Sequence, residues 1–317
     1  MLQFNKIFSF KSNTSNKIQM IKKVIYGLVK KLKFLPADVY MKFYYEYYSD
    51  KKLDLKNPIE FNQKLSWLKV YYHPPILTQL VDKYTVRDYV IEKIGEEYLN
   101  DLIAVYYKAS DVNFDELPNQ FVIKGAHGYH FNIIVDDKNK MNRKRSRYLM
   151  YKWMRKNQYY RGGLEWAYKN VKPKLIAEKY LSEIDDRSID DYKFFCFNGV
   201  PKFVQVDVDR GPNHRRAFYD LDWNRLEFHD DLRVAEEDFE QPENFEDMVT
   251  VATKLADKFP FVRVDLYSIK GKTLFGEMTF YPADARFEFY PSKYNDIIGS
   301  YIKLPKLKAG QKEITTV

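Results

Sequence analysis

Cysteine is almost absent from this 317-residue chain, which has Cys196 alone. A single thiol cannot form an internal disulfide, and scarce cysteine fits a reducing compartment, so we expect a cytoplasmic protein. Cys196 lies in an apolar strand-like segment, where a buried inert thiol is expected rather than a nucleophile. The chain also lacks an apolar run of the roughly 18–20 residues that cross a bilayer, and we expect no signal peptide at its N-terminus.

Metal-binding histidine patterns are missing as well. Only His127 and His130, of five histidines, lie close together, and no cysteine accompanies them, so we expect no zinc site. We find no internal repeat and no low-complexity tract. What the chain has is 45% hydrophobic and 30% charged residues, the composition of a globular protein with ample core.

The net charge of +8 favours polyanionic partners: nucleic acid, phosphorylated substrates or an anionic membrane surface. We interpret the charges as spread rather than clustered on one element, and no recognised nucleic-acid motif is present, so we expect no nucleic acid partner. From about Asn16 to Lys33, apolar residues recur at helical spacing among lysines. This basic amphipathic helix either docks on its own protein, which we favour, or contacts the inner face of an anionic membrane.

The order of expected elements divides the chain into five parts. We predict a basic helical extension over 1–52, a mostly helical domain over 53–119, a small strand-containing domain over 120–182, a larger antiparallel domain over 183–304 and a loose tail over 305–317. This order begins with helices, continues with mixed helices and strands, and ends with antiparallel strands. It predicts an α+β chain with mixed and antiparallel sheets, not a doubly wound one.

Turn residues locate the main elements. A helix predicted over Thr78–Ile94 ends at Gly95. The strongest hairpin signal is Asn198-Gly199, which separates two apolar strands. A helix predicted over Phe245–Lys258 leads into a second hairpin.

This second hairpin contains Asp265 and Glu277 on strands that alternate with a period of two. A three-residue loop centred on Gly271 would place the two carboxylates opposite each other, roughly 4.5–5.5 Å apart at Cβ. The same alternation puts Leu274 and Met278 on the opposite face from Phe275 and Glu277. Facing carboxylates repel unless a cation lies between them, and magnesium takes such oxygens together with substrate phosphates. The alternative is that Asp265 and Glu277 lie on an ordinary solvent-exposed hairpin edge without a metal. The hairpin considered by itself slightly favours this alternative.

Three other segments carry candidate phosphate ligands. Gly125–Gly128 follows a strand ending in Lys124 and precedes another strand, which excludes a Walker A loop, although its backbone N–H groups can still cover phosphates. Lys83 is predicted on a helix, where lysine usually faces water. A basic loop forms a candidate clamp for phosphate or carboxylate; its arginines are Arg210, Arg215 and Arg216.

Taken in chain order, these pieces resemble the ATP-grasp superfamily, and most closely its TupA-like family, over about residues 53–304. The resemblance rests on these motifs: Asn57-Pro-Ile-Glu-Phe-Asn-Gln-Lys-Leu-Ser-Trp67, Val81-Asp-Lys-Tyr84, Phe121-Val-Ile-Lys124 with His127-Gly128, Glu165-Trp-Ala-Tyr-Lys-Asn170, Asp191-Tyr-Lys-Phe-Phe-Cys-Phe-Asn-Gly199, Phe218-Tyr-Asp-Leu-Asp-Trp223, Phe261-Val-Arg-Val-Asp-Leu266 and Phe275-Gly-Glu-Met-Thr-Phe280. It implies an ATP-grasp fold, in which a small subdomain (120–182) and a large subdomain (183–304) hold ATP between them.

The resemblance implies roles for the candidate residues. Lys83 and Lys124 would hold the ATP phosphates, the 125–130 loop would cover them, and Glu178 would lie at the adenine edge beside a hinge. The implied nucleotide-binding residues are Lys83, Lys124, Gly125, His127, Gly128, Glu178, Lys179, Tyr180 and Leu181.

The metal and catalytic roles fall on the hairpin and its neighbour. Asp265 and Glu277 would ligate Mg²⁺, with Thr279 as a third ligand. Arg263 and Lys193 would be catalytic, Arg263 by neutralising the transferred phosphate. The resemblance thus implies the cofactors ATP and Mg²⁺.

Three departures from the family pattern bear on activity and substrate. Many ATP-grasp enzymes have Asn two residues after the metal-binding Glu, where this chain has Thr279. A small Pro-Gly-rich turn is replaced by Tyr281-Pro-Ala-Asp-Ala-Arg286. Tyr129 and His130 make the glycine loop bulkier than usual.

The function we expect is an ATP-dependent carboxylate–amine ligase that works through an acyl phosphate. Family membership would suggest joining an amino acid to a uronic acid sugar during cell-surface polysaccharide synthesis, with a small-molecule or sugar-linked carboxylate and an amine as substrates. The alternative enzyme is a metal-dependent glycosyltransferase that uses the Asp-x-Asp motif of Asp207 and Asp209.

Overall fold

The computed structural model describes residues 21–181, apart from 22, 26 and 30, and residues 189–208, 214–230 and 235–317. The chain divides into two compact units, Met1–Asp54 and Leu55–Val317. Within the described ranges, every helix is too short or too polar to cross a bilayer.

The N-terminal unit contains two helical segments. The described residues between 21 and 29 are helical, and α2 spans Ala37–Ser49. The apolar stripe of the first helix has exposed members, which include Ile21, Val24, Ile25 and Leu28. Docking of this stripe on the protein's own body stays a prediction.

Three helices open the second unit: α3 (Phe61–Tyr71), α4 (Ile76–Val81) and α5 (Val86–Lys93). The single helix predicted over Thr78–Ile94 is wrong, because a turn interrupts it. Asp82 Oδ1 accepts the backbone N–H groups of Tyr84 at 2.9 Å and Thr85 at 3.4 Å. Such a local side-chain hydrogen bond competes with the helical ladder. Lys83 therefore lies in a turn and not on a helix.

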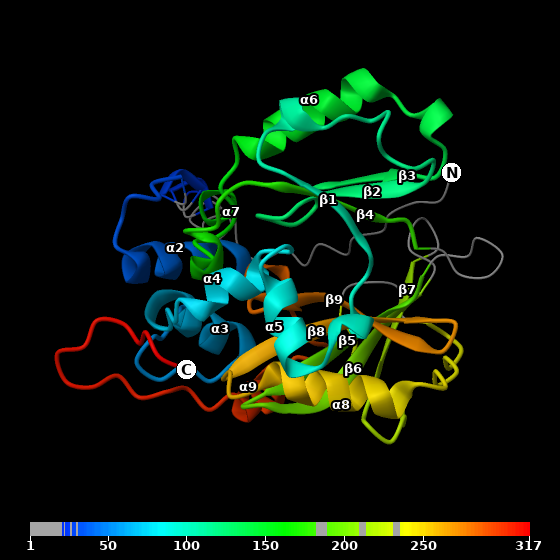
Figure 1. The fold of residues 1–317 in the computed structure, drawn as a ribbon. Helices are drawn as coiled ribbons and strands as arrows, with labels where there is room; N and C mark the ends of the chain where they lie inside the picture. The colour runs from blue at the N-terminus through cyan, green and yellow to red at the C-terminus, as the bar shows by residue number, and fades with distance from the viewer. Residues whose placement is uncertain are drawn as a thin grey trace, which may run out of the picture. The chain divides into compact units, whose positions relative to one another are not determined.

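A four-stranded antiparallel sheet follows in the order β1-β4-β2-β3 (Figure 1). One face packs against α6 through a core that includes Phe121, Ile123, Met150 and Trp153. The first strand comes from the region expected to be helical, so the small sheet begins before residue 120. The elements are β1 (Leu102–Tyr106), β2 (Phe121–Gly125), β3 (Asn132–Val135), α6 (Arg143–Met154), α7 (Gln158–Arg161) and β4 (Leu175–Lys179).

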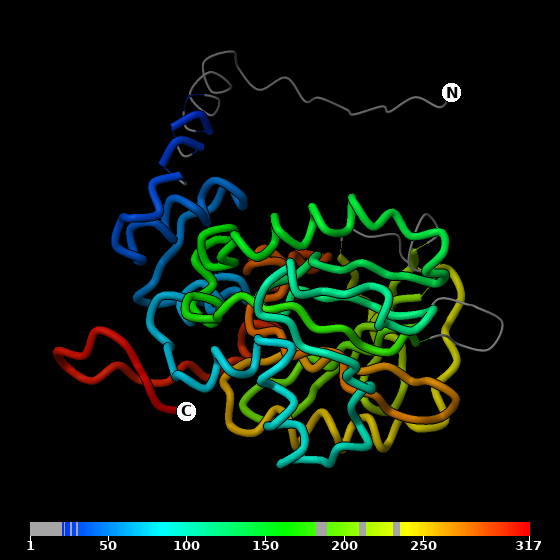
Figure 2. Tube along the Cα trace, turned by 45° about the horizontal axis from the view of Figure 1, so that its top comes forward, coloured from blue at the N-terminus to red at the C-terminus, as the bar shows by residue number. Residues whose placement is uncertain are grey.

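The second sheet has five antiparallel strands in the order β7-β6-β5-β8-β9. The Asn198-Gly199 hairpin is confirmed: β5 pairs with β6, and both turn residues have positive φ, as a type I′ turn requires. Helix α8 packs on one face of this sheet (Figures 1 and 2). Cys196 is buried. The elements are β5 (Asp191–Phe197), β6 (Val200–Val208), β7 (Arg215–Tyr219), α8 (Phe245–Ala256), β8 (Phe261–Ile269), β9 (Lys272–Thr279) and α9 (Lys293–Tyr301).

The β8–β9 hairpin pairs Asp265 with Glu277, as the sequence predicts, but by a different route. Ile269 pairs with Lys272, so the loop has two residues rather than three, and a bulge at Gly276 restores the register. A Cβ at Gly276 would lie 2.9 Å from the carbonyl oxygen of Asp265, which explains the glycine. Because of the bulge, Phe275 faces the core and Leu274 does not, the reverse of the predicted alternation.

The C-terminal tail is not loose along its length. Ile314 is buried, and its backbone N–H donates to the carbonyl oxygen of Tyr71 at 2.7 Å. Glu313 lies 2.6 Å from His73 Nδ1. These contacts fasten residues 313–314 to the end of α3.

Candidate functional site

A row of polar side chains crosses one face of the large sheet. The registers align Gln205 on β6, Lys193 on β5, Asp265 on β8 and Glu277 on β9. Residues aligned in this way share a face. Three of the four were expected to be catalytic or metal-binding, and the register brings them side by side.

Asp265 and Glu277 both have cationic partners. Arg263 donates to the two oxygens of Asp265 at 2.6 Å each, and Lys83 Nζ lies 3.0 Å from Glu277 Oε2. Burial raises the pKa of Asp265 to about 6, although Arg263 acts in the other direction. Burial also opposes ionisation of Glu277, but Lys83 and Arg263 outweigh it and lower its pKa to about 2. The Glu277 side chain remains 36% exposed, so we regard burial as its weaker influence.

The third predicted metal ligand, Thr279, lies beside these groups. Its hydroxyl is 3.3 Å from Glu277 Oε1 and accepts from Arg263 at 3.3 Å. Among the described residues no cluster of three His, Cys, Asp or Glu side chains is arranged to hold a metal. Two facing carboxylates still fit magnesium, which binds through one or two carboxylates and completes its shell with phosphates and water.

Lys193 is buried between two aspartates. Its Nζ lies 2.5 Å from Asp207 and 3.3 Å from Asp191. Arg216 adds a bidentate contact to Asp207. Burial disfavours the charge on Asp207, but Lys193 and Arg216 outweigh it and hold its pKa far below the usual range. Asp207 is thus paired with two cations, as Asp265 is with Arg263; Asp209 lies outside the described residues.

A cavity of about 330 Å³ opens beside this row. Four cationic side chains line it, and three of them, Lys193, Arg216 and Arg263, were expected in the site. The other lining residues were not expected from the sequence; they are Gln205, Asp230, Ala283, Arg286, Phe287 and Glu288. The signal for this part of the cavity was the unusual segment ending at Arg286.

That segment has a conformation that L-residues seldom adopt. Ala283, Asp284 and Ala285 all have positive φ. A buried lysine, Lys69, holds it in place by pairing with the Asp284 carboxylate and donating to the Asp284 carbonyl oxygen at 2.8 Å. The other Asp284 oxygen accepts the backbone N–H of Gly163 at 2.8 Å. Lys69 was not predicted, because an isolated lysine in a helical motif gives no sign of burial.

The turn that carries Lys83 is tied to the glycine loop. The Lys83 backbone N–H donates to Ala126 at 3.1 Å, and its Nζ lies 3.4 Å from the carbonyl oxygen of Gly128. A buried ion pair between Asp82 and Lys174 also stabilises this turn. These contacts bring Lys83, the loop and Glu277 together from three distant segments.

Most of the glycine loop is packed inside the protein. Residues 125–128 are buried, and a Cβ on Gly128 would lie 2.9 Å from the Phe131 ring. The His127 ring nitrogens face the carbonyl oxygens of Trp153 at 2.9 Å and Lys174 at 3.3 Å. The His127 side chain is therefore committed to packing, and any contact of His127 with a nucleotide has to come from its backbone.

The bulky end of the loop is anchored through Tyr129. Arg161 donates to the Tyr129 carbonyl oxygen at 2.9 Å and lies over its ring, and the Tyr129 hydroxyl is hydrogen-bonded to Glu165. Glu165 is buried, and Gln158 donates to it at 3.3 Å. Burial, followed by the nearby charge of Asp284, raises the pKa of Glu165 to about 8.

On the small sheet, Lys124 Nζ lies 2.6 Å from Glu178. The register places both side chains on the face opposite the α6 core. At the end of β4, Lys179 is exposed, its N–H donates to Asp101 and its carbonyl oxygen accepts from Asn100. Two further hinge candidates, Tyr180 and Leu181, are half-buried.

Of the predicted arginine clamp, the structure describes Arg215 and Arg216. Arg216 lines the cavity, whereas Arg215, next to it on β7, pairs with Glu237 and does not line the cavity. Neighbouring strand residues point to opposite faces, which accounts for the difference. Arg210 lies outside the described residues.

Comparison with protein families gives one match, to the family described as TupA-like ATPgrasp, over residues 63–303. A comparison with curated proteins found no match.

Solved structures similar to this chain include several whose titles name ligases. D-alanine–D-alanine ligase from Bacillus anthracis is 19% identical, with a TM-score of 0.40, over 68% of this chain and 64% of that one. The ATP-grasp ligase PsnB, complexed with a phosphomimetic precursor variant, Mg and ADP, is 10% identical, with a TM-score of 0.39, over 73% and 62%. Phosphoribosylamine–glycine ligase from Thermotoga maritima is 14% identical, with a TM-score of 0.39, over 64% and 48%. The chain thus spans less than two thirds of each of these proteins.

Proposed function

Because this chain belongs to the TupA-like ATP-grasp family, we propose that it is an ATP-dependent ligase that joins a carboxylate to an amine. One observation carries the proposal. Lys83, from a turn tied to the glycine loop, meets Glu277 beside the Arg263–Asp265 pair, and a cation-lined cavity opens next to them. Lys83, which we assign to the phosphates, the two carboxylates that we assign to Mg²⁺ and the cavity that we assign to the anionic substrate are thus contiguous.

In this proposal Lys83 and Lys124 bind the ATP phosphates, and the backbone of residues 125–130 covers them. Glu178 and the backbone of residues 179–181 contact the adenine. Asp265 and Glu277, with Thr279 beside them, would hold Mg²⁺, which would neutralise charge on the phosphates.

The reaction follows from the charge on the cavity wall. Arg263, Lys193 and Arg216 orient the substrate carboxylate, one oxygen of which attacks the γ-phosphorus while the bond to the β-phosphate oxygen breaks and ADP leaves. The same cations stabilise the negative charge on the transferred phosphoryl group. The amine nitrogen then attacks the acyl carbon, inorganic phosphate leaves, and the nitrogen loses a proton to water.

For the substrates we propose an amino acid and a uronic acid sugar, so that the product belongs to a cell-surface polysaccharide. The cationic cavity supports an acidic substrate but does not distinguish a free acid from a sugar-linked one. We place the enzyme in the cytoplasm, with the basic helix of residues 21–29 as a contact to the inner membrane face.

The test is ADP release by the full chain with Mg²⁺-ATP, measured against a matrix of amino acids and uronic acid sugars. We expect release that depends on one carboxylate and one amine together, and amide formation in that mixture. The matched control is Glu277→Gln, which keeps the shape of a partly exposed side chain and removes its charge; it should lose ADP release and keep its fold. Binding of a nucleotide-sugar without ATP turnover would favour the glycosyltransferase instead.

A further inference from the structure

One segment of the chain holds an amount of positive charge that exceeds the net charge of the whole protein. Between Lys138 and Leu164 the sequence has ten Lys and Arg residues and no Asp or Glu, while the net charge of the chain is +8. The rest of the chain is therefore slightly acidic. The lysines and arginines are therefore clustered rather than spread along the chain, in this segment on and around α6 and also in residues 1–33, which hold eight lysines and no Asp or Glu.

Helix α6 exposes most of its charged side chains to solvent. Ser146, Met150 and Trp153 are buried, the last two in the core of the small sheet. With 3.6 residues per turn, the opposite side of the helix carries Lys144 and Tyr148 and, one turn later, Tyr151 and Lys152. Tyr148 is 64% exposed and Tyr151 is 43% exposed. The outer surface is thus a strip of cations and tyrosines; with the exposed residues after the helix, it consists of Lys144, Arg145, Tyr148, Tyr151, Lys152, Arg155 and Lys156.

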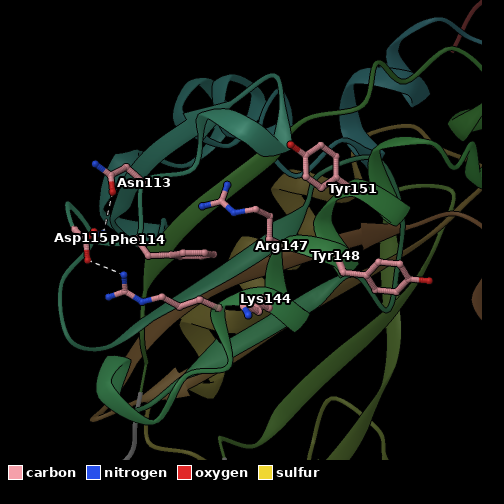
Figure 3. Close-up of a pocket in the computed structure, with 8 residues that line it drawn as sticks. Asn113, Phe114, Asp115, Lys144, Arg147, Tyr148 and Tyr151 are labelled. Carbon is pink, nitrogen blue, oxygen red and sulfur yellow. Dashed lines mark hydrogen bonds and ion pairs between the residues drawn. The ribbon is translucent and has the colours of Figure 1, made fainter.

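A hollow of about 470 Å³ lies between α6 and residues 113–115 (Figure 3). Its innermost cation, Arg147, is used structurally: it donates to the carbonyl oxygens of Ala109 at 3.2 Å and Val112 at 3.1 Å and lies over the Phe114 ring. Arg143 pairs with Asp115 at 2.8 Å. Lys144, at the rim, has no ion-pair partner within the described ranges. Figure 3 shows the Tyr148 side chain extending away from Phe114 and Asp115.

We propose that this strip of α6 is an electrostatic docking surface for an anionic phospholipid bilayer. Basic residues near such a surface each contribute about 1 kcal/mol, and tyrosine rings suit the headgroup level. Helix α6 makes this contact without inserting, because its apolar side is already packed on the sheet.

Two observations favour a bilayer over a nucleic acid strand. A single helix on the surface offers a convex strip, whereas single-stranded nucleic acid is bound in grooves that follow its backbone. In addition, the N-terminal unit exposes Val24, Ile25 and Leu28 on a lysine-containing helix, which suits an interface between lipid and water. Each surface alone would bind weakly, and stable membrane attachment generally takes two such signals.

The test is flotation of the full chain with vesicles of phosphatidylcholine alone or with about a third phosphatidylglycerol, at low and moderate salt. The variant K144Q/K152Q/R155Q removes three outward charges. From about fivefold per charge, we expect its partition coefficient on the anionic vesicles to fall by about a hundredfold at low salt. The matched control K202Q/K254Q/K272Q removes three exposed lysines from elsewhere in the second unit and should change it by less than fivefold. Wild type should bind neutral vesicles far less than anionic ones.

The proposal is overturned if the α6 variant and its control bind alike, or if wild type does not distinguish anionic from neutral vesicles. It is also overturned if V24S/I25S/L28S abolishes binding while the α6 variant keeps it. Binding of single-stranded RNA or a polyuronate through the same α6 charges, with no vesicle binding, would replace the bilayer with that polymer. None of these readouts depends on ligase activity, so failure here and failure of the proposed function are separable.

Discussion

The two sheets of the second unit carry charge in different ways. The large sheet buries it: Lys193, Asp207, Arg263 and Asp265 lie on one face and neutralise one another. The small sheet has an apolar core against α6, a single Lys124–Glu178 pair on its other face, and a large positive charge on the outside of α6. Charge on the large sheet is therefore part of the fold as well as of the site, whereas charge on the small sheet can change without unfolding the protein.

The sharpest test of this difference is Arg263→Gln. It leaves the buried Asp265 carboxylate beside a neutral amide, and breaking a buried pair from one side typically costs 3–5 kcal/mol. We expect the free energy of unfolding, measured in urea, to fall by about that amount. Glu277→Gln is the control, because its side chain is 36% exposed and should cost less than about 1 kcal/mol. Equal losses in the two variants would contradict the claim that the large sheet depends on its buried charges.

A second test concerns Glu165, which lies outside both sheets. Folding raises its pKa from 4.5 to about 8, so the folded chain holds more protons than the unfolded chain between those pH values. The stability that this proton contributes is complete below about pH 4.5 and is lost as the pH rises through 8. We expect wild type to lose roughly 2–4 kcal/mol more than Glu165→Gln between pH 5 and pH 8 in urea unfolding. Parallel pH profiles would rule out a protonated Glu165 at neutral pH.

The third test addresses the small sheet. Lys124→Met should weaken ATP binding by about 10–100-fold, because a charge-assisted hydrogen bond to phosphate contributes about 1.5–3 kcal/mol. It also leaves Glu178 without its partner. The double variant K124M/E178Q removes that leftover charge, so thermal stability should recover while ATP affinity, measured by calorimetry, should not. Recovery of both thermal stability and ATP affinity in the double variant would mean that the Lys124–Glu178 pair stabilises the fold and does not bind ATP.

The smallest expected effect is at the hinge. Lys179 and Asp101 form an ion pair whose side chains are both mostly exposed, so Lys179→Gln should cost less than about 1 kcal/mol. If the hinge contributes through its backbone, ATP affinity should be unchanged within twofold in the same calorimetric titration. A large loss of affinity would assign the role to the lysine side chain instead.

Local patterns predicted more of the large sheet than of the small one. The Asn198-Gly199 turn and the alternation around Asp265 are signals between chain neighbours, and both give the correct strand pairs. β1 was not identified, because its pairing with β4 joins residues about 70 positions apart and leaves no local mark. Of the four cationic residues that line the cavity, the sequence led us to expect Arg263, Lys193 and Arg216 in the site, but not Arg286.

The sequence by itself determined the family, the hairpin that pairs Asp265 with Glu277, and the concentration of cations between residues 138 and 164. Residue identity and short-range spacing are enough for these features. Only the tertiary structure decided that Lys83 sits in a turn against Glu277, that Lys69 is buried under Asp284, and that Arg216 lines the cavity while Arg215 does not. Such placements depend on which distant strand or turn packs against a residue, and that is a property of the whole fold.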